Sequence, residues 1–290
     1  MLLKEIKNIF HSELDMLYGK EEVASFFYLL IEHFFGLERF ILAIQPDVVI
    51  DKEQETLIFH ALSELKVEKP IQHILGVAHF MDLDFKVNEH VLIPRPETEE
   101  LVRWILEDAK VVNNTLTILD MGTGSGCIPI SLNANLPNAK VYGLDISQEA
   151  IKVAYENNKT HGTNVEFLCA DILHLEHNDI QDEVLKQGFD VMVSNPPYVR
   201  ELEKSDMRKN VLKHEPNLAL FVSDKNPLQF YKSIVAYASM HLNEKGRLYL
   251  EINQYLGREM IELLKKYDFQ TIELRQDLFG NDRMLKGVKK

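Results

Sequence analysis

The chain has 290 residues, of which 46% are hydrophobic and 27% charged, and its net charge is −13. This composition excludes a collagen-like or largely disordered protein, and the length favours two domains or one large domain with an extension. The acidic balance repels phosphate backbones, so no direct binding of nucleic acid is expected, although a local basic groove could still provide it. Two cysteines are too few for a disulfide framework or a four-thiolate zinc site, and their usage is typical of a reducing compartment, the cytoplasm.

The apolar segments are short. The first residues mix charged and apolar side chains and lack the unbroken apolar stretch of a signal peptide. The densest apolar segment, residues 24–31, is closed by Glu32 and His33 and is too short to span a membrane. We therefore expect no membrane association.

Residues 1–75 are predicted to form a bundle of about four amphipathic helices, since apolar side chains recur there at three- and four-residue spacing. Pro46 ends the third helix, and Asp51 with Gln54 three positions later resembles a capping box at the start of the fourth. The phenylalanine-rich stripes are expected to be core, because short helices need an apolar face to pack at all.

Residues 76–96 are predicted to form a β-hairpin linker. Side chains alternate between polar and apolar from Asp82 to Val87, as they do in strands, and the segment continues into Ile93-Pro94-Arg95-Pro96. Acidic residues directly after Pro96 mark the start of a helix that extends to Asp108.

Residues 97–290 alternate strand and helix, which predicts an α/β domain with a doubly wound, mostly parallel sheet. The predicted strands are Thr117–Met121, Lys140–Asp145, Asn164–Ala170, Phe189–Ser194 and Arg247–Ile252. Helices are expected after Gly126, Ser147, Pro227 and Tyr255. Two further strands, Phe269–Arg275 and Arg283–Val288, flank a turn-rich connection and predict an antiparallel pair at the sheet edge.

A glycine-rich turn follows the first of these strands and precedes a helix. Gly122, Gly124 and Gly126 permit positive φ and let the backbone approach a ligand closely, while the following helix directs free N–H groups toward it. Because the glycine spacing alone is a weak signal, a purely structural turn remains the alternative.

Two aspartates end the next strands. Asp145 could accept both hydroxyls of a ribose, and the competing role as a helix cap fits Ser147 better. Asp171 could meet an adenine amino group, or it could be an ordinary turn residue.

The strongest signal is Asn195-Pro196-Pro197-Tyr198, directly after an apolar strand. Two prolines fix two φ angles and remove two donors, which leaves rigidly directed carbonyl oxygens. The Asn195 side-chain oxygen and the Pro196 carbonyl could bind the two hydrogens of an amide or amino nitrogen and aim that nitrogen at an electrophile. Tyr198 would supply an aromatic surface for a flat group.

These features resemble the class I S-adenosylmethionine-dependent methyltransferases, in which Asn-Pro-Pro-Tyr marks enzymes that methylate planar nitrogens. The resemblance narrows to the PrmC/HemK family, the glutamine methyltransferases of peptide-chain release factors, and covers essentially the whole chain. Its motifs occur here in the family's order, as Pro70–Gly76, Val91–Glu99, Asp120–Cys127 and Glu215–Leu220. Nucleic-acid adenine methylases share the Asn-Pro-Pro-Tyr loop and lack the Ile-Pro-Arg-Pro-Glu-Thr-Glu segment.

The resemblance implies S-adenosylmethionine as cofactor and a role for each matching residue. The cofactor would be bordered by Gly122, Thr123, Gly124, Ser125, Gly126, Asp145, Asp171 and Asn195. The substrate amide would be gripped by Asn195, Pro196, Pro197 and Tyr198, with Asn195, Pro196 and Tyr198 as the catalytic groups. The chain departs from the family pattern at Pro129, in Ser223–Pro227 and at Asn253, where loop geometry is expected to differ.

The expected reaction is methylation of the glutamine amide in the Gly-Gly-Gln loop of release factors, with residues 1–75 as a docking domain for that protein. The alternatives are a glutamine methyltransferase of a ribosomal protein, a nucleic-acid adenine methylase and a non-catalytic binding module. No metal site is expected, because His174 and His177 near Cys169 lack a fourth ligand. Cys127 is expected to be a small buried hydrophobe, and the basic run from Arg200 to Lys213 a solvated face.

Overall fold

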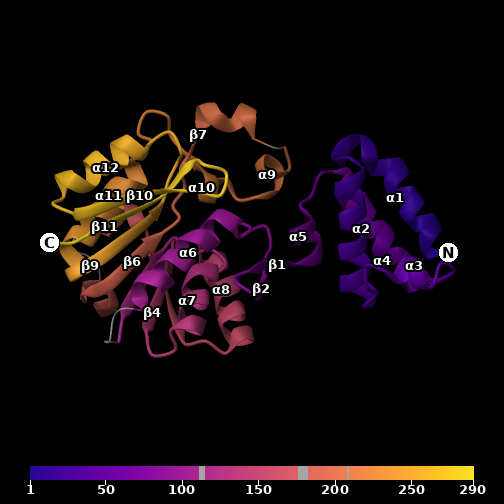
Figure 1. The fold of residues 1–290 in the computed structure, drawn as a ribbon, viewed down its shortest axis with the longest axis horizontal. Helices are drawn as coiled ribbons and strands as arrows, with labels where there is room; N and C mark the ends of the chain where they lie inside the picture. Colours follow the sequence, from indigo (N-terminus) through magenta and orange to yellow (C-terminus); the bar gives the residue numbers. More distant parts are fainter. Residues whose placement is uncertain (111–114, 176–181, 208) are drawn as a thin grey trace. The chain divides into compact units, whose positions relative to one another are not determined.

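The computed structural model describes residues 1–110, 115–175, 182–207 and 209–290 (Figure 1). The chain divides into two compact units. The helical unit comprises Met1–Gly76 together with Arg208–His214, and the sheet unit comprises Val77–Met207 and Glu215–Lys290. Within the described ranges, no helix is both long enough and apolar enough to cross a membrane.

The helical unit has the predicted bundle. Its helices are α1 (Leu3–Tyr18), α2 (Lys20–Phe35), α3 (Ile41–Ile44), α4 (Lys52–Lys66), α5 (Ile71–Leu75) and α9 (Lys209–His214). The capping box is confirmed, since Asp51 accepts from the Gln54 N–H at 2.9 Å and the Gln54 side chain accepts from the Asp51 N–H at 3.0 Å. The sequence analysis missed α5, which begins after Pro70 because proline is tolerated at a helix start.

The predicted hairpin is confirmed as an antiparallel pair, β1 (Val77–Phe80) and β2 (Leu83–Lys86). Phe80 and Phe85 are buried in the same cluster as Trp104 of α6 (Pro96–Ala109). The chain after β2 is held in the same unit, because Val91 and Ile93 are buried with Ala150 and Val153. The hairpin is therefore part of the core of the sheet unit.

The fold-class prediction is also confirmed. A seven-stranded sheet has the order β10-β11-β9-β6-β3-β4-β5, and only β11 runs antiparallel to both of its neighbours. The strands are β3 (Thr117–Met121), β4 (Lys140–Asp145), β5 (Val165–Cys169), β6 (Phe189–Ser194), β9 (Leu242–Glu251), β10 (Gln270–Gln276) and β11 (Asp282–Val288).

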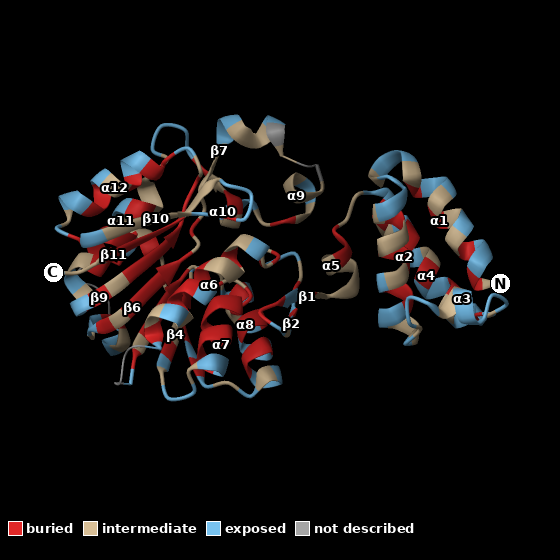
Figure 2. Ribbon diagram, in the orientation of Figure 1, coloured by how far each residue is buried: buried red, intermediate tan, exposed pale blue. Residues whose placement is uncertain are grey.

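Helices cover both faces of this sheet. Successive residues of β3 point to opposite faces, so Ile118 belongs to the cluster that contains α6 and Leu119 to the other cluster. The first face is covered by α6, α7 (Cys127–Asn135) and α8 (Gln148–His161), and the second by α11 (Gln229–His241) and α12 (Gly257–Lys266). In Figure 2 the central strands of the sheet are mostly buried, whereas the edge strand β10 has no buried residue. The helices that cover the sheet have one buried side and one more exposed side.

The segment between β6 and α11 contains short elements that the sequence analysis did not predict. Here β7 (Val199–Arg200) pairs in parallel with β8 (Phe221–Val222), and the 3₁₀ helix η3 (Glu201–Asp206) and α10 (Asn217–Leu220) lie between them in the chain. Two more 3₁₀ turns, η1 (Ile172–His174) and η2 (Glu183–Lys186), follow β5. Two-residue strands and single turns are too short to show periodicity, which is why the sequence pattern did not reveal them.

Candidate functional site

The carboxyl ends of the parallel strands bring the predicted site residues to one edge of the sheet. Because β3 lies between β6 and β4, the loops after these strands are neighbours. A cavity of about 270 Å³ lies at this edge, and its lining includes Gly122, Gly124, Asp145, Asp171, Asn195 and Pro197. This is the position at which doubly wound sheets bind ligands.

The glycine loop has the conformation that its composition predicts. The φ angles of Gly122, Gly124 and Gly126 are 83°, 54° and 81°, in the region that favours glycine. Gly126 is the N-cap of α7, where a Cβ atom would lie 2.9 Å from the Ile130 Cδ1 atom. Gly122 and Gly124 line the cavity, whereas Thr123, Ser125 and Gly126 do not. The Thr123 and Ser125 side chains are buried.

Asp145 is held rigidly beside this loop. One carboxylate oxygen accepts from the Gly124 N–H and the other from the Ser147 N–H, each at 2.9 Å. Burial raises the pKa of Asp145, and the backbone N–H groups oppose that rise. The Ser147 hydroxyl accepts from the Ala150 N–H at 3.2 Å, which confirms Ser147 as the cap of α8. Asp145 is thus left to face the cavity, as the ribose hypothesis requires.

Asp171 lines the cavity and also caps η1. One oxygen accepts from the Leu173 N–H at 2.9 Å, and the other lies 2.6 Å from His174 Nδ1. The adenine contact stays a prediction, since both of the weighed roles are compatible with this position. His177 lies outside the described residues, and the described part of the chain has no cluster of three or more His, Cys, Asp or Glu side chains suited to a metal ion.

The loop Asn195–Tyr198, named the Asn195 loop, is anchored by side chains from distant elements. The Asn195 Nδ2 atom donates to Thr98 Oγ1 of α6 at 3.1 Å, and the Tyr198 hydroxyl donates to Glu251 Oε1 at 2.9 Å. Pro197 lines the cavity. Pro196 is buried and outside the lining, so its role as a carbonyl acceptor stays a prediction.

Three residues of this region were not predicted as site residues. Thr98 and Glu251 are buried side chains that contact the Asn195 loop. Asp120 is fully buried beside the glycine loop, neither of its oxygens accepts a well-formed hydrogen bond, and burial raises its pKa to about 7. The sequence held one sign of Asp120 and Glu251, since each is a carboxylate within an otherwise apolar run, in β3 and β9.

A partly buried ion pair connects two segments that line the cavity. Glu215 accepts from the Arg95 guanidinium at 2.6 Å and from the Ile93 N–H at 3.2 Å. The lining includes residues 89–92 before Arg95 and Pro216, Leu218 and Ala219 after Glu215. The motifs Val91–Glu99 and Glu215–Leu220, which lie far apart in the chain, are therefore joined at one wall of the cavity.

The remaining sequence hypotheses concern single side chains. Cys127 is buried, and burial raises its pKa to about 12, as expected of an unreactive thiol. In the basic run, Arg200 is paired with Glu203 and Lys204 with Glu201, so these two cations are neutralised locally. Pro129 lies in the first turn of α7, where proline is tolerated.

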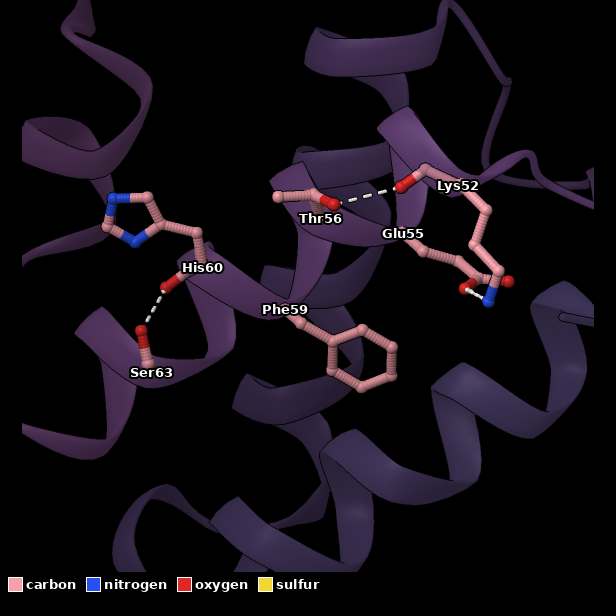
Figure 3. Close-up of a pocket in the computed structure, with 6 residues that line it drawn as sticks. All are labelled: Lys52, Glu55, Thr56, Phe59, His60 and Ser63. Atoms are coloured by element: carbon pink, nitrogen blue, oxygen red, sulfur yellow. Dashed lines mark hydrogen bonds and ion pairs between the residues drawn. The ribbon is translucent and has the colours of Figure 1, made fainter.

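A second, open pocket lies along α4 in the helical unit. Figure 3 shows its lining residues, Lys52, Glu55, Thr56, Phe59, His60 and Ser63. Glu55 is paired with Lys52 and with the Met1 amino group, and the hydroxyls of Thr56 and Ser63 donate to carbonyls of the same helix. Because all six side chains come from one helix and these polar groups are engaged, the pocket does not offer converging groups for chemistry.

Comparisons with known proteins agree with the motifs and the fold. A methyltransferase domain model matches residues 113–273, and a PrmC N-terminal domain model matches residues 16–76. The release factor glutamine methyltransferase of Flavobacterium psychrophilum is 47% identical over 99% of both chains, and that of Bacteroides thetaiotaomicron is 38% identical over 98% of this chain and 99% of its own. A methyltransferase structure from Pyrococcus furiosus shares the fold, with a TM-score of 0.52, 17% identity and coverage of 82% of this chain and 99% of that one. The chain belongs to the release factor glutamine methyltransferase family.

Proposed function

We propose that this protein transfers a methyl group from S-adenosylmethionine to the side-chain amide nitrogen of the glutamine in the Gly-Gly-Gln loop of peptide-chain release factors. Asn195 carries the proposal. It lines the cavity beside the glycine loop, its side-chain nitrogen is bound to Thr98, and its side-chain oxygen accepts no hydrogen bond from the described residues. An acceptor is thereby left available for an amide N–H of the substrate.

The cavity fits S-adenosylmethionine chemically. The cofactor supplies a methyl group on a sulfonium, which makes that carbon electrophilic. Asp145 and Asp171 line the cavity, where Asp145 would accept the ribose hydroxyls and Asp171 would meet the adenine. The backbone of Gly122 and Gly124 would allow close approach. Asp120 lies outside the lining, but its buried carboxylate has no well-formed hydrogen bond, and a positive charge bound nearby would favour its ionised form.

The chain's own contribution to the reaction is mainly positioning. An amide nitrogen is a poor nucleophile because its lone pair is delocalised into the carbonyl group. Acceptors at the Asn195 side chain and the Pro196 carbonyl would bind the two N–H groups, orient the nitrogen toward the methyl carbon and stabilise the positive charge that develops on it. The proton can leave after transfer, so the mechanism requires no general base.

The helical unit is proposed to dock the protein substrate. It contributes none of the residues that line the cavity, and most of it matches the PrmC N-terminal domain model. Binding energy collected away from the reacting glutamine would favour a folded protein substrate over a free amide.

The direct test offers the full-length enzyme and labelled S-adenosylmethionine to purified release factor, ribosomal proteins and DNA. We expect label in the release factor, at the Gly-Gly-Gln glutamine by peptide mass spectrometry. The matched control is Asn195→Ala, which should retain the cofactor site and lose transfer. Incorporation into ribosomal protein or DNA, with none into release factor, would reject the proposed substrate.

A further inference from the structure

A buried carboxylate lies behind the Asn195 loop. Glu251, the last residue of β9, is 1% exposed. Its Oε2 atom accepts from the Thr98 hydroxyl at 2.6 Å, and its Oε1 atom accepts from the Tyr198 hydroxyl at 2.9 Å. Thr98 in turn contacts the Asn195 amide at 3.1 Å. The Thr98 side chain thus connects Glu251 to Asn195, the residue that lines the cavity.

The charge state of Glu251 decides the direction of these hydrogen bonds. When Glu251 is ionised it only accepts, so each hydroxyl then donates its single hydrogen to the carboxylate. The Thr98 oxygen is then left as an acceptor, and of the two ends of the Asn195 amide only the NH₂ group can donate to it. The amide oxygen must therefore turn away from Thr98.

The surroundings of Glu251 include groups that favour and oppose its ionised form. The pKa of Glu251 is raised, chiefly by burial, and the charge of Glu97 acts in the same direction. The hydrogen bonds from Thr98 and Tyr198 and the charge of Arg283 favour the ionised form and offset only part of that rise. The Tyr231 hydroxyl donates to the Glu251 backbone carbonyl and so leaves the carboxylate to the other two hydroxyls.

We propose that Glu251 is ionised in the working enzyme and that Thr98 and Glu251 are positioning residues, which lock the Asn195 amide with its oxygen available to the substrate glutamine. This inference rests on the proposed function. Without the lock, the amide could rotate and present NH₂, a donor, to the N–H groups of the substrate amide. Such an orientation places donor against donor and cannot hold the nitrogen for in-line transfer.

The central test compares Thr98→Val with Thr98→Ser, since valine matches threonine in shape and serine keeps the hydroxyl. Single-turnover methyl transfer to release factor should slow roughly tenfold in Thr98→Val, the effect of losing one directional hydrogen bond. Thr98→Ser should remain within about twofold of the wild type. Cofactor affinity should be nearly the same in both variants, whereas the melting temperature should fall in Thr98→Val, because buried Glu251 loses one of its donors. Equal rates in the two variants, whether both normal or both slow, would overturn the proposal.

A double-mutant cycle separates positioning from a general structural role. In an Asn195→Ala background, Thr98→Val should cause no further loss of rate, because the amide that Thr98 orients is gone. A second loss of the same size would show that Thr98 acts by another route. Glu251→Gln should slow transfer at least as much as Thr98→Val, since a glutamine amide can donate to Thr98 and reverse the direction of the chain of hydrogen bonds.

A spectroscopic measurement keeps the inference separate from the identity of the substrate. The Asn195 Nδ2 protons, observed by ¹⁵N NMR in selectively labelled enzyme, should be protected from exchange in the wild type and in Thr98→Ser, and unprotected in Thr98→Val. This result does not depend on methyl transfer. If release factor is not methylated but the protection pattern holds, the proposed function fails alone; unprotected Asn195 protons in an enzyme that methylates release factor would reject the lock alone.

Discussion

Replacing Asp120 by asparagine tests the energetic cost of a carboxylate that is buried before the cofactor binds. Both oxygens are buried without a well-formed hydrogen bond, and burial raises the pKa of Asp120 from 3.8 to about 7. The folded state therefore binds this proton more tightly than the unfolded state does. The resulting stability is fully present below pH 3.8 and is lost as the pH rises toward 7.

The size of the effect follows from the same two values. Each pKa unit corresponds to about 1.4 kcal/mol, so ionised Asp120 lowers the free energy of unfolding by about 4 kcal/mol at pH 8. At pH 5 the loss is about 2 kcal/mol, because at that pH only part of the difference in proton binding between the folded and unfolded states has accumulated. The change between the two pH values, about 2–3 kcal/mol, does not depend on how well the asparagine amide packs.

The assay is urea unfolding of the cofactor-free protein at pH 5 and pH 8. We expect the gain in unfolding free energy of Asp120→Asn over the wild type to be about 2–3 kcal/mol larger at pH 8 than at pH 5. Glu244→Gln, which removes an exposed acid in β9, serves as the control and should show no such difference. A stability change of equal size at both pH values would refute the raised pKa and, with it, the cost assigned to the buried charge.

Three other substitutions test the site and its wall. Asp145→Ala should weaken S-adenosylmethionine binding by roughly 1–3 kcal/mol in calorimetry, and unchanged affinity in a folded variant would remove Asp145 from the cofactor site. Asn195→Ala should lower turnover by about 100-fold or more with little change in cofactor affinity, whereas near-normal methylation would contradict its role as an acceptor. Arg95→Ala should cost about 2 kcal/mol in denaturation, since it leaves buried Glu215 without its cation, and Arg95→Lys should recover part of that. This cost is smaller than for a fully buried pair because the Arg95 side chain keeps 32% of its exposure, and a loss near zero would show that the pair does not hold the wall.

Much of the sheet unit could be predicted because its strands are apolar runs that end in distinctive residues. The observed limits of β3, β4 and β6 agree with the predicted ones. The apolar pattern of each strand stops at distinctive residues: the glycine loop after β3, Asp145 and its turn at the end of β4, and Asn195 with two prolines after β6. The cavity could be anticipated for the same reason, since parallel strands bring their carboxyl ends to one edge.

The supporting contacts could not be predicted, because they join residues far apart in the chain. Thr98 and Glu251 are separated by 153 positions, and neither the helix pattern around Thr98 nor the strand pattern around Glu251 indicates that the two side chains meet. Arg95 and Glu215 are separated by 120 positions and pose the same difficulty. Local periodicity reports which face of an element is buried, but not which partner it meets there.

The assignment of α9 to the helical unit constrains how parts of this enzyme can be exchanged with those of its relatives. The chain passes between units after Gly76, before Arg208 and after His214. Within the helical unit, Lys213 forms an ion pair with Glu68 at 3.4 Å and His214 contacts the Val67 carbonyl at 3.1 Å. A chimera with a single junction at residue 76 would therefore combine α9 from one parent with the helices of another. An exchange that preserves both units needs three junctions, so that residues 208–214 are inherited together with the first 76.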